Sequence, residues 1–152
     1  MRDLRTIFNE HNLRCTCQRM AVYETLAQCH CHPTAEQLHQ MVGEQCDVSL
    51  SLATIYNTLE AFCQAGLAQR LPTPNGCCRY DATLENHLHV RYRESDAIED
   101  VPADLSQRFL DRIPKEVLEE IASEMGVSID GVNIELVASR VGDRTSQVDS
   151  DC

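Results

Sequence analysis

The first half of the chain is divided into short helical segments that end in a turn-rich loop, and this arrangement constrains the fold most. Apolar residues recur at helical spacing in each segment, and residues that favour helix ends separate the segments. We expect four helices, at residues 2–12, 18–29, 34–43 and 52–65. Two strands, residues 66–71 and 77–81, then flank a Pro-Thr-Pro-Asn-Gly loop that is typical of a hairpin. Short helices followed by a β-hairpin predict a winged helix-turn-helix.

The fourth predicted helix has two chemically different faces. Its apolar face carries Leu52, Ile55 and Leu59, whereas the opposite face holds small or hydrogen-bonding residues, namely Ala53, Thr54, Tyr56, Asn57 and Ala61. In a winged helix the last helix before the hairpin lies in the major groove, where such side chains suit close approach to base edges and thymine methyl groups. The same pattern also fits the solvated face of an amphipathic helix, so spacing alone leaves both interpretations open.

Charge divides the chain into two halves. The net charge is −11, of which residues 1–81 contribute −2 (6 basic against 8 acidic residues) and residues 82–152 contribute −9 (7 against 16). An acidic total argues against loose DNA binding driven by charge, but a near-neutral first half is compatible with a specific DNA reader. We expect an α+β protein with domains at residues 1–83 and 84–141, followed by a disordered polar tail at residues 142–152.

The acidic half predicts a second, mixed domain. We expect a strand near residues 97–101, helices at residues 102–113 and 114–125, and a final strand or two within residues 127–141. Its apolar surface is more than a domain of about 60 residues needs for its own core, which favours dimerisation.

Apolar runs and cysteine content indicate the cellular compartment and the kinds of covalent or metal cross-link that the chain could contain. No apolar run approaches the ~18 residues that span a bilayer, and the N-terminus has no apolar stretch of the signal-peptide type, so we expect a cytoplasmic protein without a membrane partner. The nine cysteines are odd in number and include no Cys-x-x-Cys pair. This pattern argues against a disulfide framework and against the usual zinc-knuckle spacing.

A His-x-His motif follows the predicted hairpin and carries the second candidate activity. On a strand, His87 and His89 would point to the same face, and Asp81 and Asp100 lie a short distance away in the sequence. Two imidazoles and two carboxylates are good ligands for a divalent first-row metal. An isolated His-x-His is more often a pair of packed or exposed histidines, and spacing alone does not decide between the two interpretations.

A chain of motifs in a fixed order resembles the ferric uptake regulator (Fur) family over about residues 4–140. The matching segments are Thr16-Cys17-Gln18-Arg19, His32-Pro33-Thr34-Ala35, Ser51 through Leu59, Gly66-Leu67, Arg79-Tyr80-Asp81, His87-Leu88-His89 and Gly126 through Leu136. The Ala-Thr-x-Tyr-Asn-x-Leu helix together with His-x-His is a specific combination.

The resemblance implies a homodimeric, metal-responsive transcriptional repressor with an N-terminal winged helix and a C-terminal α/β dimerisation domain. One divalent metal ion per subunit, Fe²⁺ or Mn²⁺ in the cell with Zn²⁺ as a substitute, would bind between the domains and set the DNA-binding conformation. Its ligands would be His32, Asp81, His87, His89 and Asp100. The partner would be a double-stranded DNA operator, contacted by Arg19, Ser51, Ala53, Thr54, Tyr56 and Asn57.

Departures from the family pattern leave the sensed ligand open. Where relatives place the cysteines of a structural zinc site, this chain has Tyr92, Ser95, Arg140 and Asp143, so we expect no Cys₄ zinc. Aspartates at positions 81 and 100 resemble the peroxide-responsive branch, whereas the missing cysteines are shared with haem-responsive iron-response regulators. A small metallo-hydrolase is the enzyme alternative, but no candidate nucleophile motif accompanies the His/Asp cluster, and we expect no enzymatic activity.

Overall fold

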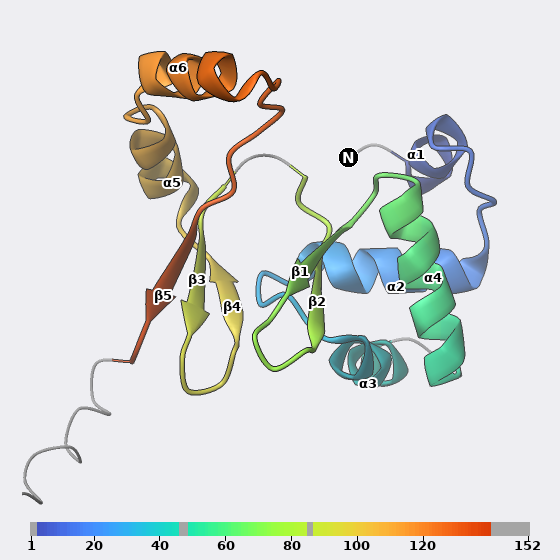
Figure 1. Cartoon of the computed structure of the whole chain (residues 1–152). Helices are drawn as coiled ribbons and strands as arrows, with labels where there is room; N and C mark the ends of the chain where they lie inside the picture. The colour runs from blue at the N-terminus through green and yellow to red at the C-terminus, as the bar shows by residue number, and fades with distance from the viewer. Residues whose placement is uncertain (1–2, 46–48, 85–86, 141–152) are drawn as a thin grey trace, which may run out of the picture. The chain divides into compact units, whose positions relative to one another are not determined.

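The computed structural model describes residues 3–45, 49–84 and 87–140, which form two compact units separated in the sequence at residues 85–86 (Figure 1). The predicted domain boundary, at residues 83–84, is close to this division. The tail predicted at residues 142–152 lies outside the described residues.

The first unit is a winged helix. Four helices, α1 (Leu4–Glu10), α2 (Cys17–Gln28), α3 (Ala35–Gln45) and α4 (Leu52–Gln64), precede an antiparallel hairpin of β1 (Gln69–Pro72) and β2 (Cys78–Asp81). The hairpin starts three residues later than predicted, because residues 66 and 67 terminate α4. Gly66 has a φ of 68°, and the Leu67 N–H donates to the Phe62 carbonyl at 2.8 Å.

Side-chain caps and an aromatic cluster fix the helices of this unit. Thr34 and Gln37 form a capping box at the start of α3, because the Thr34 N–H donates to Gln37 Oε1 at 2.9 Å and the Gln37 N–H donates to Thr34 Oγ1 at 3.3 Å. Phe8 and Phe62 are fully buried, and Tyr23 packs edge-on against both rings. The helices therefore have defined ends and a common core.

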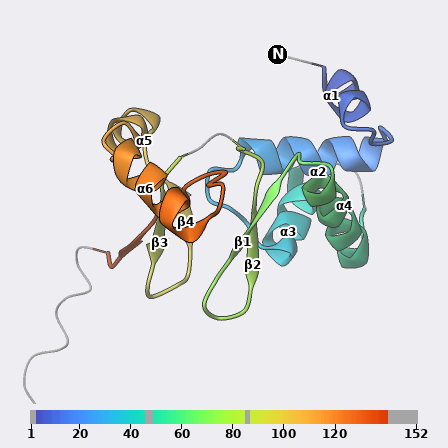
Figure 2. The same cartoon turned by 45° about the horizontal axis from the view of Figure 1, so that its top comes forward.

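The second unit combines a three-stranded sheet with two helices. The strands are β3 (His89–Tyr92), β4 (Ile98–Asp100) and β5 (Glu135–Ala138), and the helices are α5 (Ala103–Leu110) and α6 (Lys115–Met125). The strand order is β4-β3-β5, with β4 antiparallel and β5 parallel to β3. A parallel pair requires a long crossover, and α5 and α6 lie in that connection (Figure 2). The fold class is therefore α+β, as predicted.

None of the helices in the described ranges is long and apolar enough to span a lipid bilayer.

Candidate functional site

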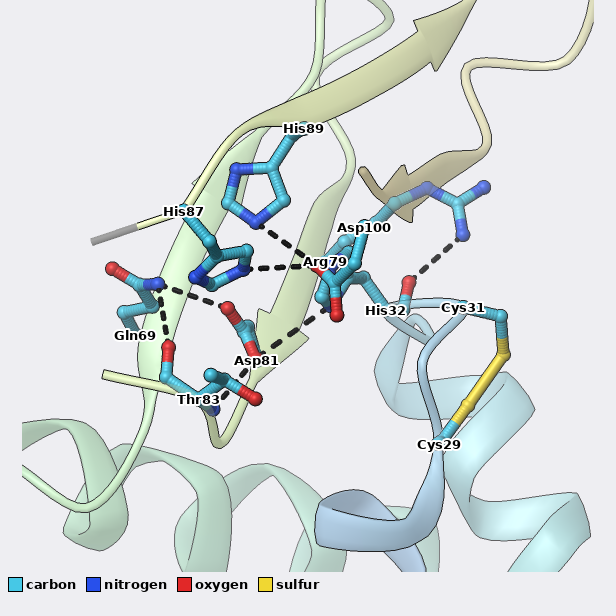
Figure 3. Close-up of polar contacts among 10 residues, drawn as sticks. All are labelled: Cys29, Cys31, His32, Gln69, Arg79, Asp81, Thr83, His87, His89 and Asp100. Carbon is cyan, nitrogen blue, oxygen red and sulfur yellow. Dashed lines mark hydrogen bonds and ion pairs between the residues drawn. A yellow bond between two sulfur atoms is a disulfide. The ribbon is translucent and has the colours of Figure 1, made fainter. Parts of the chain in front are cut away.

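Three predicted metal ligands lie together in the second unit. His89, at the start of β3, is directly opposite Asp100 at the end of β4. The Asp100 Oδ1 atom lies 2.9 Å from His87 Nε2 and 3.5 Å from His89 Nε2 (Figure 3). The two imidazole rings are 4.3 Å apart between centroids. Around an ion bound at about 2.1 Å, neighbouring ligand atoms are separated by about 3 to 3.5 Å, so this spacing fits a first-row divalent metal.

The backbone between the two histidines is held from both sides. His87 precedes β3 instead of lying within it, yet the expected side-by-side arrangement of the rings is present. The Leu88 N–H donates to the buried Ser106 hydroxyl on α5 at 2.7 Å, and the Leu88 carbonyl accepts from the Val101 N–H at 2.9 Å. Ser106 was not predicted, because an isolated serine in a helix carries no local signal of this bond.

The other two predicted ligands, His32 and Asp81, lie together in the first unit. His32 Nδ1 and Asp81 Oδ1 are 3.7 Å apart. The carboxylate is oriented by Gln69 Nε2, which donates to Oδ2 at 2.9 Å, and by the Thr83 N–H, which donates to Oδ1 at 2.7 Å (Figure 3). Ligand orientation by surrounding hydrogen bonds is a common property of metal sites.

Arg79 fixes the backbone at His32. Its Nη1 donates to the His32 carbonyl at 3.0 Å and to Gln37 Oε1 at 3.3 Å. His32 has a φ of 43°, which is uncommon for a residue other than glycine, and the next carbonyl, that of Pro33, accepts from the Tyr80 N–H at 3.1 Å. The motif that contains Arg79 gives no local signal of its contact with His32, because the two residues are 47 positions apart.

The five predicted ligands therefore form two groups, one in each unit. We call His32 and Asp81 the first group, and His87, His89 and Asp100 the second group. All five offer imidazole nitrogen or carboxylate oxygen, a donor set that suits Fe(II), Mn(II), Zn(II) or Ni(II) and does not favour copper(I).

The predicted DNA-contacting residues are arranged along α4 and at the start of α2. Ala53, Tyr56 and Asn57 are exposed, whereas Ile55 and Leu59 on the opposite face are fully buried. Ser51 is the N-cap of α4, because its Oγ accepts from the Thr54 N–H at 3.1 Å. The helix is thus amphipathic as predicted, with its polar face accessible.

Arg19 borders a hollow of about 310 Å³ beside this polar face. The hollow is lined by Arg14, Thr16, Gln18, Arg19, Thr54, Asn57 and Thr58. The Arg19 side chain is held near α2 because its Nη1 donates to the Arg14 carbonyl at 3.0 Å. Two guanidinium groups next to an exposed polar helix face suit contact with DNA phosphates.

Tyr56 is tied to the preceding helix by a contact that sequence analysis did not identify. Its hydroxyl donates to Glu36 Oε1, on α3, at 2.5 Å. This hydrogen bond raises the pKa of Tyr56 to about 12 and lowers the pKa of Glu36 below its ordinary value. The exposed ring is therefore held in one position by a carboxylate.

Three of the four positions at which the family resemblance places zinc cysteines make other contacts, and the fourth, Asp143, lies outside the described residues. The Tyr92 hydroxyl donates to Glu99 Oε2 at 3.2 Å, and the Arg140 guanidinium carbon lies 4.9 Å from the centre of the Tyr92 ring. Ser95 Oγ accepts from the Ala97 N–H at 3.3 Å. A different pair, Cys29 and Cys31, forms a disulfide, which the odd cysteine count did not predict.

Comparison with known proteins identifies relatives among metal and peroxide regulators. The profile of the ferric uptake regulator family matches residues 10–137. The peroxide-responsive repressor PerR of Staphylococcus saprophyticus is 34% identical over 90 residues, 59% of this chain and 60% of that protein. PerR of Staphylococcus aureus strain Mu50 is 35% identical over 78 residues, 51% of this chain and 52% of that protein. The matches thus span only half to three fifths of these relatives.

Solved structures share the fold at lower identity. The Vibrio cholerae ferric uptake regulator superposes with a TM-score of 0.70 at 21% identity, covering 91% of this chain and all of that one. The Campylobacter jejuni peroxide stress regulator superposes with a TM-score of 0.65 at 24% identity, covering 93% of this chain and 99% of that one. Because the family profile covers most of the sequence, and the same winged helix and α/β unit recur in these structures, the chain belongs to the ferric uptake regulator family.

Proposed function

We propose that this protein is a metal-responsive transcriptional repressor that binds a double-stranded DNA operator as a homodimer in the cytoplasm. The observation that carries the proposal is the pair of His/Asp groups, because each unit contributes preformed nitrogen and oxygen ligands. The exposed polar face of α4, with Arg19 nearby, supports DNA contact.

The first and second groups would together hold one divalent cation per subunit. If they share one ion, Asp81 and Asp100 must approach each other, which like charges oppose. The bound cation supplies the positive charge that offsets this repulsion. The cation can favour the DNA-binding orientation of the two units only to the extent that it binds this orientation, in which all ligands contact it, more tightly than the other orientations.

By fixing the orientation of the two units in each subunit, the cation would set the spacing of the two recognition helices in a dimer. Each α4 must enter a major groove, and the separation of the two half-sites is fixed by the DNA helix. A protein whose units take several relative orientations matches that separation only part of the time, so its apparent affinity for the operator falls by that fraction.

Fe²⁺ or Mn²⁺ would be the physiological ion, with peroxide as the signal to which the repressor responds. Two features support this finer proposal: the carboxylate ligands at both 81 and 100 are aspartates, and the curated relatives reported above are named peroxide-responsive repressors. Zn²⁺ would also occupy such a site, since it binds these donors more tightly than either ion.

Titration of operator DNA in Mn²⁺ and in chelator tests the proposal. We expect tight binding only with Mn²⁺, and loss of that dependence in His89→Ala. His11→Ala is the matched control, because His11 is a histidine of the first unit that lies outside both groups and far from His32 in the sequence. Equal DNA affinity with and without Mn²⁺ in the unaltered protein would contradict metal control, and unchanged metal dependence in His89→Ala would contradict the ligand assignment.

A further inference from the structure

A disulfide between Cys29 and Cys31 lies immediately before the candidate ligand His32. The two Cα atoms are 5.4 Å apart, and the bridge follows the last residue of α2 (Figure 3). Cys29 is the C-cap of that helix, and its N–H donates to the Leu26 carbonyl at 3.1 Å. The bridge therefore spans the short segment that joins a helix end to a ligand.

Both sulfur atoms belong to residues that solvent can reach. Cys31 and the intervening His30 are exposed, and Cys29 is half-buried. Among the described residues, the remaining cysteines are free thiols, and they comprise Cys15, Cys17, Cys63, Cys77 and Cys78. A small oxidant or reductant thus has access to this pair without unfolding of the core.

The segment between the bridge and the ligand has little freedom. His32 follows Cys31 directly, adopts a φ of 43°, and has its carbonyl held by Arg79 at 3.0 Å. In the same disulfide-bonded state, His32 Nδ1 lies 3.7 Å from Asp81 Oδ1. The oxidised form therefore presents both ligands of the first group in a defined arrangement.

We propose that Cys29 and Cys31 are a thiol–disulfide modification site whose oxidation by a hydroperoxide increases metal affinity through His32. The metal part of this inference rests on the proposed function above. One thiolate attacks the peroxide oxygen and becomes a sulfenic acid, and the leaving oxygen departs as water once protonated. The second thiolate then attacks the sulfenic sulfur, which releases a second water, so that two thiols are oxidised and one hydrogen peroxide is reduced to two waters.

Pre-organisation links the bridge to the metal. A closed bridge removes backbone conformations from residues 29–31, so His32 loses less conformational freedom when it binds a cation. The two equilibria must be coupled reciprocally: if the disulfide tightens metal binding by some factor, bound metal must shift the dithiol–disulfide equilibrium toward the disulfide by the same factor. We expect a factor of about five to ten, at the low end of common coupling energies.

Bridge formation can be measured without reference to metal. The full-length protein is reduced, treated with one equivalent of hydrogen peroxide and alkylated, and peptide masses then report which cysteines remain free. We expect peroxide to protect Cys29 and Cys31 from alkylation while Cys77 stays reactive. Full alkylation of the pair after oxidation would overturn the proposal, whether or not the protein binds DNA.

The coupling is tested by Mn²⁺ titration of the oxidised and reduced protein, with free Mn²⁺ followed by electron paramagnetic resonance. We expect the oxidised protein to bind about five to ten times more tightly, the Cys29→Ser/Cys31→Ser variant to show a single weak affinity, and Cys77→Ser to behave like the unaltered protein. Equal affinity in the two redox states would overturn the coupling. If neither state binds Mn²⁺, the proposed metal site and the coupling are both contradicted. The alkylation experiment still tests the thiol–disulfide site, because it does not depend on metal binding.

A glutathione redox buffer supplies the reciprocal measurement. Saturating Mn²⁺ is expected to raise the equilibrium ratio of disulfide to dithiol by the same factor found in the titration. A ratio that does not respond to Mn²⁺, in a protein that binds Mn²⁺, would contradict the inference.

Discussion

Tyr56 is held at the surface of α4 by one carboxylate, and this contact makes the first prediction at the scale of single residues. The hydrogen bond from Tyr56 lowers the pKa of Glu36 in the folded protein. The bond therefore stabilises the fold fully at a pH above the pKa that Glu36 has in the unfolded chain, and this stabilisation is lost as the pH falls through the pKa of Glu36 in the folded protein. In Tyr56→Phe we expect the pKa of Glu36 to rise toward its ordinary value, as measured by carbon NMR of the carboxyl group. The other glutamates in the same spectrum are the internal control, and an unchanged Glu36 titration would show that the bond is absent in solution.

Ser106 carries a second prediction at this scale. Its buried hydroxyl accepts from the Leu88 N–H between the two histidines of the second group. In Ser106→Ala the buried N–H loses its partner, and we expect the free energy of unfolding to fall by about 1–3 kcal/mol and Mn²⁺ binding to weaken. Denaturant unfolding and Mn²⁺ titration are the measurements.

Ser95→Ala is the matched control for Ser106. Ser95 also accepts a backbone N–H, that of Ala97, but the bond is exposed in a turn, so water can replace it. We expect a change of less than about 0.5 kcal/mol. Equal losses in the two variants would mean that burial of the Leu88–Ser106 bond has no special role.

At the scale of elements, Arg91 on β3 forms ion pairs with β5 and with the turn that joins β3 to β4. Its side chain is 14% exposed and contacts Asp96 Oδ1 and Glu135 Oε2, each at 3.1 Å. Arg91→Met leaves two carboxylates close together without their cation, and we expect the midpoint of denaturant unfolding to fall. The double variant Arg91→Met/Glu135→Gln should recover part of that loss in a double-mutant cycle. A loss that is purely additive would show that the two side chains do not interact.

The elements themselves were largely predictable from the sequence, because their signals are local. Thr34, Gln37 and Ser51 mark helix starts within three residues of their partners. The alignment of His89 with Asp100 follows from one short hairpin.

What the sequence did not reveal is long-range contact. Arg79 reaches back 47 residues to His32, Tyr56 reaches 20 residues to Glu36, and Ser106 reaches 18 residues to Leu88. No pattern of spacing specifies such pairs, since tertiary packing alone brings their atoms together. The same holds for the contact of the Arg140 guanidinium with the Tyr92 ring, which joins residues far apart in the sequence.

For the whole molecule, the exposed apolar residues of the second unit predict how copies associate. Val117, Ile121 and Met125 form a stripe on α6, with exposed fractions of 47%, 41% and 69%. Leu105 and Phe109 on α5 and Leu136 and Val137 on β5 are also exposed. So much exposed apolar surface on one small unit is typical of a protein–protein interface, and a second copy of the chain is the partner that the proposed function requires.

Introducing a charge into this stripe tests whether the stripe is the dimer interface. In Ile121→Glu a carboxylate would have to be buried at the interface, and we expect dimer dissociation to become at least about a hundredfold easier, which corresponds to roughly 3 kcal/mol. Sedimentation velocity should show a monomer, and operator affinity should fall because one subunit reads only one half-site. Ser123→Glu adds the same charge on another side of α6 and should remain dimeric. A dimeric Ile121→Glu protein would place the interface elsewhere, whereas a monomer with unchanged operator affinity would contradict the need for two linked recognition helices.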